Sequence, residues 1–222
     1  MILLKFWIIT ASALGLLHAA GAPPVTPGWE PGGNTLTVGS VPAAKAAAHG
    51  WKALIADVEK WHFSTAYDQA HPVWAIKVIC RIAHRAGEQC IAAPALDLFG
   101  GRPGRYLASG VVTRAARSAD VWEIQAQKLE LRPAEYAAFV KAVARQARAV
   151  HPGIRIVAGL TTSSRVGHVT GSALWTAYKS VRYVVAGYWA NVPQPGPWCP
   201  DCGPVNPAPM VYVLNKIAEA RS

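Results

Sequence analysis

Short apolar runs alternate along the chain with longer stretches whose apolar residues recur at helical spacing. The apolar runs predict strands at residues 51–59, 89–99, 119–127, 154–162 and 182–192, with a weaker strand at 34–40. Several strand centres (ALIA, IAAPAL, IRIVAG and YVVAG) are apolar at almost every position. This pattern is typical of strands that are buried on both faces.

The intervening stretches predict helices. The clearest covers residues 132–153, where Val140, Val143 and Ala147 lie on one stripe and Pro152–Gly153 follows the end. Further helices are expected at residues 41–50, 71–87, 104–118, 172–181 and 207–220. The alternation of strand and helix, at about 30 residues per unit, predicts βα repeats on a parallel sheet.

We therefore expect an α/β fold made of parallel βα repeats. Five firm strands and one weak strand are fewer than the eight of a full TIM barrel, so the predicted architecture is a shortened or irregular TIM-like barrel. The alternative is an open doubly wound sheet. No G-x-G-x-x-G motif follows a predicted strand, which disfavours the nucleotide-binding form of that alternative.

Residues 1–22 have the layout of a secretory signal peptide. Lys5 precedes an apolar run over residues 6–17, and small residues follow at 19–22. The run is shorter than the ~20 residues that span a bilayer, so we expect cleavage, no stable membrane insertion of the mature chain, and an extracytoplasmic location. Residues 23–33 are predicted to be a flexible lead-in, and residues 34–222 a single domain.

The chain contains 22 Lys and Arg against 12 Asp and Glu, a formal net charge of +10. Such an excess can attract an anionic cell-surface polymer, although cations dispersed over the surface would only aid solubility, and the scattered spacing favours the dispersed arrangement. No basic run is interleaved with aromatic residues, so nucleic acid is not expected as a partner. We expect a monomer without a metal or other cofactor, because no H-E-x-x-H motif occurs and the histidines lack ligand spacing.

Polar and aromatic side chains gather where the predicted strands end. They are Asp57, Glu59, Trp61, Asp97, Glu123, Gln125, Gln127, Thr161, Tyr188, Trp189 and Asn191. Ligand sites of parallel α/β folds lie beyond the carboxyl ends of the strands, so we expect these side chains to form one site. Side chains alternate along a strand, which predicts that Asp57, Glu59 and Trp61 share a face.

The carboxylates among these residues indicate acid/base chemistry. A carboxylate is costly in a buried strand unless it is paired or used, and two neighbouring carboxyls have pKa values that move apart. Glu59 is the first candidate for general acid or nucleophile, with Asp57 or Asp97 as its partner. Indole rings and amides beside them suit sugar rings and hydroxyls. The alternative for each carboxylate is a structural ion pair or a helix cap.

Several of these segments resemble a group of secreted, largely uncharacterised proteins with glycosidase-like TIM-barrel character. The resemblance rests on ALIADVEKWHFS with Asp68-Gln69 and Pro72 after it, then IAAPALDLF, ADVWEIQAQ, IVAGLTT and GYWANVP, and it covers residues 50–193. It implies a barrel fold and a glycan-related function but assigns no catalytic residues. Asp57-Val58-Glu59 is similar to the end of the chitinase-type motif, whose earlier aspartates are absent from residues 53–56.

Four cysteines occur at positions 80, 90, 199 and 202. The C-x-x-C of PWCPDCGP has the spacing of a thiol–disulfide enzyme, but only 20 residues follow Cys202, too few for the rest of a thioredoxin fold. An oxidising compartment favours two disulfides, and local pairing is the simplest of the three connectivities: Cys80–Cys90 and Cys199–Cys202.

Three classes of function remain open. The first is a secreted glycoside hydrolase-like protein that acts on a glycan or cell-surface polymer by carboxylate acid/base chemistry. The second is a carbohydrate- or polymer-binding protein that uses the same scaffold without catalysis. The third, and least favoured, is a thiol oxidoreductase that uses Cys199 and Cys202.

Overall fold

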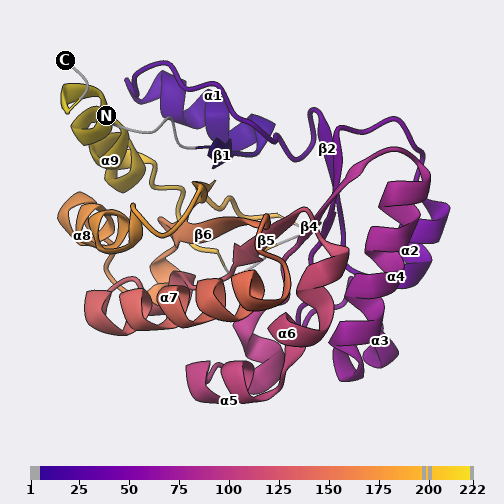
Figure 1. Ribbon diagram of the computed structural model, residues 1–222. Coiled ribbons are helices and arrows are strands. Elements are labelled where there is room, and N and C mark those ends of the chain that lie inside the picture. Colours follow the sequence, from indigo (N-terminus) through magenta and orange to yellow (C-terminus); the bar gives the residue numbers. More distant parts are fainter. Residues whose placement is uncertain (1–5, 197–198, 200–201, 221–222) are drawn as a thin grey trace.

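The computed structural model describes residues 6–196, 199 and 202–220 (Figure 1). These residues form one sheet of seven parallel strands in the order β1-β7-β6-β5-β4-β3-β2. The strands are β1 (Phe6–Ile8), β2 (Thr35–Val38), β3 (Ala53–Ala56), β4 (Gln89–Ala92), β5 (Val121–Ile124), β6 (Arg155–Thr161) and β7 (Gly187–Asn191). All six strands predicted from apolar runs are present, and the predicted α/β class with parallel βα repeats is confirmed.

Helices follow most of the strands. They are α1 (Ala11–Ala19), α2 (Val41–Ala46), α3 (Ala66–Ala70), α4 (Pro72–Arg85), α5 (Pro103–Ala108), α6 (Val111–Ala115), α7 (Pro133–Val150), α8 (Gly171–Val181) and α9 (Ala208–Glu219). Short 3₁₀ turns are η1 (Leu96–Phe99), η2 (Ala116–Ser118), η3 (Gln127–Leu129) and η4 (Ser164–Val166). The helix predicted at 104–118 is thus divided into α5, α6 and η2. Gly110 lies between α5 and α6 as the N-cap of α6, with the positive φ of 70° that glycine adopts without strain.

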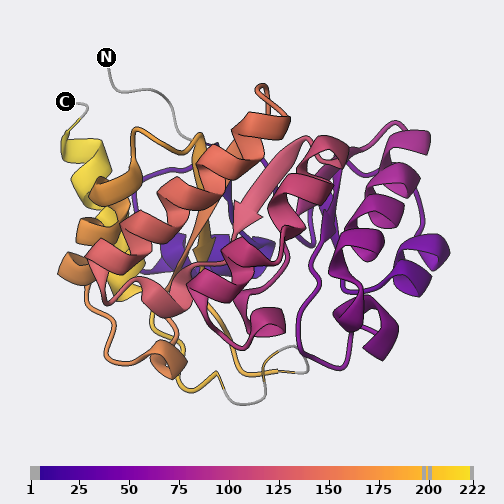
Figure 2. The same cartoon turned by 60° about the horizontal axis from the view of Figure 1, so that its bottom comes forward.

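The two faces of the sheet pack against different partners. Leu54, Trp122 and Tyr188 face the helices and belong to the large core, which includes residues of α4, α7, α8 and α9. The opposite face carries a smaller apolar cluster of Ile8, Trp29, Ala53, Ile55, Ile91, Ala93, Val121 and Val157, none of which lies in a helix. Neighbouring helices α4, α6, α7 and α8 contact one another in sequence along the outside (Figure 2). A doubly wound sheet would have helices on both faces. This sheet curls around its own inner cluster, as a partial TIM-like barrel does.

The two edges of the sheet approach each other through residues 28–31. Ile8 of β1 forms a parallel bridge with Trp29, and Pro31 forms one with Thr35 of β2. Ile9 N–H donates to the Trp29 carbonyl over 3.2 Å. The Trp29 indole is 2% exposed and donates to Gln89 Oε1 over 3.1 Å. Residues 28–31 of the predicted flexible lead-in (23–33) are therefore part of the fold, with Trp29 buried at the amino ends of the strands.

Residues 6–19, within the predicted signal peptide, are folded in this structure. β1 pairs in parallel with β7, and α1 contacts α9. Trp7, Ile9 and Leu17 belong to the main core. Lys5, the positive charge of the predicted signal, lies outside the described residues. Signal cleavage remains a prediction, and it would remove β1 and α1 from the sheet and the helical layer.

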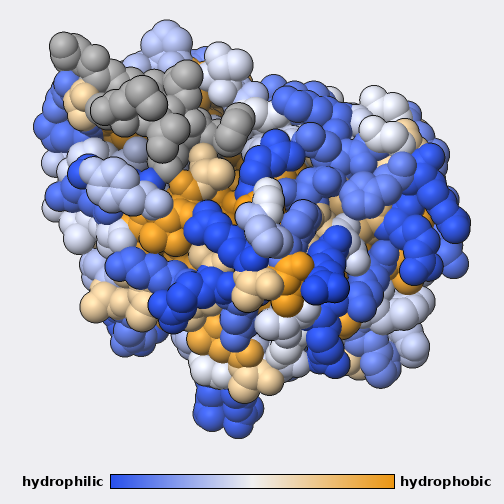
Figure 3. All heavy atoms as spheres, in the orientation of Figure 1, coloured by the Kyte–Doolittle hydropathy of each residue, from blue (hydrophilic) through white to orange (hydrophobic). Residues whose placement is uncertain are grey.

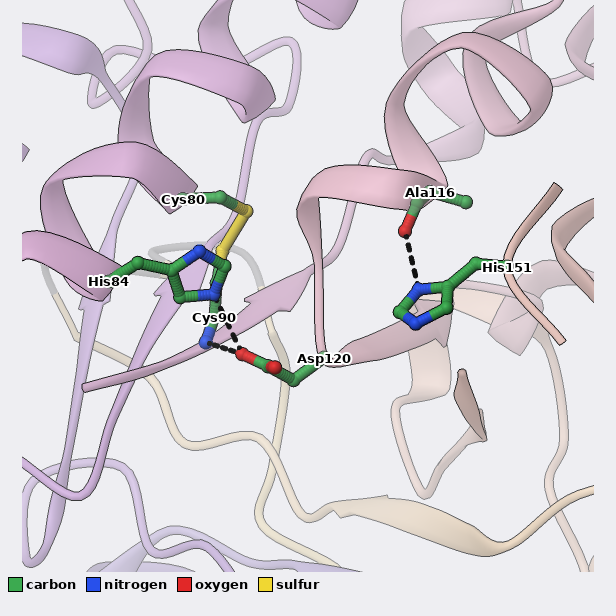
Figure 4. The surroundings of a disulfide bond; sticks show 6 residues. All are labelled: Cys80, His84, Cys90, Ala116, Asp120 and His151. Atoms are coloured by element: carbon green, nitrogen blue, oxygen red, sulfur yellow. Dashed lines mark hydrogen bonds and ion pairs between the residues drawn. A yellow bond between two sulfur atoms is a disulfide. The ribbon is translucent and has the colours of Figure 1, made fainter. Parts of the chain in front are cut away.

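Both predicted disulfides are confirmed. Cys80–Cys90 links α4 to β4 (Figure 4). Cys199–Cys202 closes the C-x-x-C loop, within which Pro200 and Asp201 lie outside the described residues. In the part of the chain that the structure describes, no helix is long and apolar enough to cross a membrane.

Candidate active site at the carboxyl ends of the strands

The inner face of the sheet changes from apolar to polar toward the carboxyl ends of the strands. Inner positions alternate with core positions, so Ile55 is followed on the inner side by Asp57, and Val121 by Glu123 and Gln125. Asp57 is only 7% exposed and Glu123 is fully buried. The predicted gathering of carboxyl and amide groups at the strand ends is thus observed for this part of the site, which we call the acidic rim (Asp57, Glu59, Asp97, Glu123 and Gln125).

Asp57, Glu59 and Gln125 form one hydrogen-bonded cluster. Gln125 Nε2 donates to Asp57 Oδ1 over 2.6 Å and to the Ala93 carbonyl over 3.0 Å. The carboxyl groups of Asp57 and Glu59 also bond to each other, and Glu59 bonds to Gln125. β3 ends at Ala56, so these contacts arise from the loop after the strand, whose Glu59 N–H is held by Ser64 Oγ over 3.1 Å.

Asp97 approaches the cluster from the neighbouring strand. It lies in η1, just after β4, and its Oδ1 accepts the Lys60 N–H over 3.2 Å. Its side chain is half-buried, as is that of Glu59. The negative charge of Asp97 is close enough to oppose ionisation of Glu59. Two carboxyls from different strands are therefore adjacent, and both can be reached by solvent.

Burial is the main cause that raises the pKa of Glu59, and the charge of Asp97 raises it further, while hydrogen bonds from Gln125 and Asp57 and the charge of Lys128 lower it in part. Burial also raises the pKa of Asp57 well above its usual range, with added repulsion from Glu59 and Glu123. The cluster thus holds protons above the pH at which free carboxyls lose them.

Glu123 lies deeper in the barrel, on β5. Neither of its carboxyl oxygens has a hydrogen-bond partner among the described residues. Burial raises its pKa well above the ordinary value, and the charge of Glu59 adds to the shift. A fully buried carboxyl without a partner is stable only in the protonated form, so Glu123 is the neutral, polar floor of the rim.

Other predicted site residues divide between the inner face and the core. Trp189 is half-buried and packs on the inner cluster, as predicted. Tyr188 points the other way: it is fully buried among the helices, and its hydroxyl donates to the Tyr178 carbonyl over 2.8 Å. Tyr188 therefore lies outside the site in which it was expected, because adjacent strand residues face opposite sides and Trp189 takes the inner one.

Gln127, Thr161 and Asn191 lie on the inner side of the adjoining strand ends. A Cβ at Gly159 of β6 would lie 2.5 Å from Gln127 Nε2, so the glutamine side chain occupies the space that this glycine leaves on the inner face. Thr161 is buried, and its Oγ1 accepts the Ser163 N–H over 3.1 Å. Asn191 at the end of β7 is half-buried.

Trp61 does not continue the strand pattern. The chain turns after Glu59, with the Trp61 N–H bonded to the Glu59 carbonyl over 3.0 Å. The Trp61 indole donates to Ser64 Oγ over 2.9 Å and packs edge-on against Phe63. The predicted shared strand face of Asp57, Glu59 and Trp61 is therefore replaced by a turn, which brings the two carboxyls together and leaves the indole half-buried.

Two residues of the site were not predicted. Lys128 follows Gln127, and its charge favours the ionised form of Glu59. Glu130 is fully buried and accepts the Thr161 N–H over 2.9 Å, while burial raises its pKa well above its ordinary value. The signal for Glu130 in the sequence is its position between Leu129 and Leu131, an acid within a short apolar stretch.

The arrangement can donate and accept protons beside a half-buried surface of amides and indoles. Among residues 6–196, 199 and 202–220, no three His, Cys, Asp or Glu side chains are grouped to hold a metal ion.

No protein-family model and no curated protein matches this sequence. Among solved structures, the chain is similar to a GH18 chitinase from Pseudoalteromonas aurantia, with a TM-score of 0.37 and 12% identity over 88% of this chain and 69% of that chain. It is also similar to a glycosyl hydrolase family 2 member from Bacteroides cellulosilyticus DSM 14838, with a TM-score of 0.32 and 10% identity over 71% of this chain and 27% of that chain. These weak structural neighbours are glycoside hydrolases. At such scores the likeness assigns no activity to this chain.

Proposed function

We propose that the protein hydrolyses a glycosidic bond of a glycan outside the cytoplasm, with Glu59 as general acid and Asp97 as its carboxylate partner. The observation that carries this proposal is the acidic rim, where a half-buried Glu59 with a raised pKa lies next to Asp97 from a different strand. A raised pKa keeps a carboxylic acid protonated near neutral pH, which is the state that a general acid requires.

Asp57 has a supporting part in this proposal. Its carboxyl is hydrogen-bonded to Glu59, and two groups in direct contact cannot lie on opposite sides of a glycosidic bond. Carboxyl pairs that cleave such bonds are ~5–5.5 Å apart in retaining enzymes and ~6.5–9.5 Å apart in inverting enzymes. Asp97 approaches from the end of β4, so the Glu59–Asp97 pair can flank a bond while Asp57 and Gln125 hold Glu59 in place.

The groups around the pair suit a sugar chain. Trp189 and Trp61 provide half-buried indole faces, and Gln127 and Asn191 provide amides that can donate to and accept from hydroxyl groups. The two disulfides accord with an oxidising compartment, which supports an extracytoplasmic site of action.

The test is a hydrolysis assay of the purified full-length chain against a panel of polysaccharides. On a substrate that the wild type cleaves, Glu59→Gln should lower turnover by ~10²–10⁴-fold, because the amide keeps the shape but cannot donate the proton. Asp97→Asn should reduce turnover similarly. The matched control is Glu135→Gln, an exposed glutamate of α7 that pairs with Arg132, and it should leave turnover unchanged. Unchanged turnover in Glu59→Gln would overturn the assignment.

Glycan binding without cleavage is the second candidate. It is favoured by the contacts of Glu59, whose carboxyl is already bonded to Asp57 and Gln125. If no polysaccharide is cleaved but one binds, and Trp189→Ala abolishes that binding while Glu59→Gln preserves it, the binding function replaces hydrolysis.

A further inference from the structure

A basic hollow lies on the outer helical layer, away from the acidic rim. It is lined by Lys77, Arg81, His84, Arg85, Arg117 and Ser118, without a carboxylate. Lys77, Arg81 and Arg85 are exposed side chains of α4, and Arg117 is an exposed side chain of η2. Four permanent cations therefore share one concave surface.

These cations have no acidic partners in the described part of the chain. The ion pairs there involve His49, His84, Arg132 and Lys216. Asp120, the acid beside this hollow, is already bonded to His84 and to the Cys90 N–H (Figure 4). Arg117 Nε donates to the Val150 carbonyl over 2.9 Å, which positions its guanidinium without neutralising it.

A second basic hollow lies on α7, on the side that faces Val184 after α8. Its lining includes the exposed Lys141, Arg145 and Arg148, again with no acid. η2, which carries Arg117, contacts both α4 and α7, and the two hollows share no lining residue. We call the combined surface the basic band: Lys77, Arg81, Arg85, Arg117, Lys141, Arg145 and Arg148. In the space-filling view, hydrophilic residues predominate over α4 and recur along α7 (Figure 3).

Helical spacing explains why these residues seem scattered along the sequence. Positions 77, 81 and 85 are four apart, and positions 141, 145 and 148 are four and three apart, so each set projects from one side of its helix. The expectation of a dispersed basic surface is wrong for these two helices.

The band is suited to a chain of anionic groups. Lys77 and Arg85 are separated by eight residues of α4, a distance of ~12 Å along the helix, and further cations follow on η2 and α7. The charges are exposed and spread out, which does not make a pocket for one small ion. Five of the seven residues are arginines, whose planar guanidinium groups match phosphate geometry. The linings of the two hollows contain no Phe, Tyr or Trp ring on which a nucleic acid base could stack.

We propose that the basic band binds a flexible linear polymer that carries phosphate groups, as an attachment surface separate from the acidic rim. Bound phosphates would relieve the repulsion among the unpaired cations and release counterions, so binding should weaken steeply with salt. This surface requires no catalysis at the rim, and either proposal can fail alone.

The test is binding of the full-length chain to fluorescently labelled linear polyphosphate at a series of NaCl concentrations. Arg81→Glu/Arg85→Glu should weaken binding by at least tenfold in low salt. It should also reduce the slope of log K against log salt by about 1.4, since each lost contact to a single strand contributes about 0.7. Arg81→Gln/Arg85→Gln should reduce the slope similarly with a smaller loss of affinity, and this milder pair tests the band if the charge reversal impairs folding.

The control is Arg102→Glu/Arg105→Glu on α5, two exposed arginines outside both hollows. It changes the net charge by the same amount, from +10 to +6, and should leave the slope unchanged. If both charge-reversal pairs lower the affinity and the salt slope equally, binding depends only on net charge and not on the basic band, and the proposal is overturned. Equal affinity for polyglutamate, or tighter binding of a DNA oligonucleotide with the same number of phosphates, would overturn the assignment to a phosphate polymer.

Discussion

Asp120 and Glu123 lie three residues apart at the two ends of β5, and their surroundings differ. Asp120 Oδ2 accepts the Cys90 N–H over 2.8 Å and the His84 ring over 2.9 Å (Figure 4). Partial burial alone would raise the pKa of Asp120, but these bonds and the charges of His84 and Arg155 outweigh it and lower the pKa. Glu123, with no partner for either oxygen, has a raised pKa.

The same contrast holds for the two ends of the sheet. At the amino end, Trp29 has Gln89 as a hydrogen-bond acceptor and the Arg155 guanidinium over its ring at 5.0 Å. At the carboxyl end, buried carboxyls are clustered with too few donors to hold their charges. Polar groups that have hydrogen-bond partners stabilise a fold. Buried carboxyls with too few hydrogen-bond donors have shifted pKa values, which suits them to proton transfer. Four predictions test this division, beginning with the largest effect.

Trp29→Ala should cost ~3–5 kcal/mol in the free energy of unfolding, because it removes a buried indole from the inner cluster and leaves Gln89 without its donor. Urea unfolding monitored by circular dichroism measures the loss. Trp74→Ala is the control, since Trp74 is 43% exposed, and its cost should be far smaller. A loss below ~1 kcal/mol for Trp29→Ala would mean that the amino end does not depend on this residue.

Replacing Cys80 and Cys90 together by Ala should cost roughly 2–3 kcal/mol, because the disulfide closes a loop with a sequence separation of 10 and its absence frees the unfolded chain. Replacing Cys199 and Cys202 should cost less, because their separation is 3. Thermal unfolding of both double variants provides the comparison. Cys90 lies near the amino end of β4. A larger stability loss for the Cys199/Cys202 variant than for the Cys80/Cys90 variant would therefore contradict the view that the amino end stabilises the fold.

Asp120→Asn should cost about 1 kcal/mol at pH 7, a low value for hydrogen bonds to a charged group because the side chain is partly exposed. A lowered native pKa contributes stability above the unfolded value of 3.8, and this contribution disappears as the pH falls through the native pKa. The difference from wild type should therefore vanish in acid. Unfolding curves measured from pH 2 to 7 give the test, and a constant difference would contradict it.

Glu123→Gln should have the opposite dependence on pH and the smallest effect at pH 5, because native Glu123 is protonated there and the amide imitates that form. A raised native pKa gives stability that is complete below the unfolded value of 4.5 and is lost as the pH rises through the native pKa. The variant should avoid this loss and become more stable than wild type in alkali. If the free energies of unfolding of the variant and the wild type change in parallel with pH, the pKa of Glu123 is not raised in the native state and the prediction fails.

The fold was predictable where burial and sequence pattern agree. The centres of β3 and β6 are apolar because both faces are covered, and the stripe of α7 appears at helical spacing. β1 and α1 were not predicted as parts of the fold, since an apolar segment followed by small residues has the same composition in a leader and in a core. Trp29 was missed because its neighbours are prolines and glycines.

The site was predictable as a set of residue types and less so as contacts. Alternation along a strand places Glu123 and Gln125 on one face, but it gives no information on which of Tyr188 and Trp189 faces inward. That choice depends on the register of β7 against β6, in which Gly159 is paired with Trp189. The bond between Asp57 and Glu59 depends on a turn after Ala56, and a turn made by Ser64 and Trp61 has no strong sequence signal.

The pairing of β1 with β7 has a consequence for the order of events during synthesis. Residues 6–8 are synthesised before their partner strand at 187–191, which follows about 180 residues later in the chain. At ~5–20 residues per second, a ribosome needs on the order of ten seconds or more to cover that interval. Throughout it the apolar segment 6–19 has no partner strand in the sheet and remains open to any factor that binds nascent apolar chains. Under the predicted export, recognition of this segment as a signal and its pairing with β7 would compete, and the speed of translation would set how long the export pathway has to act first.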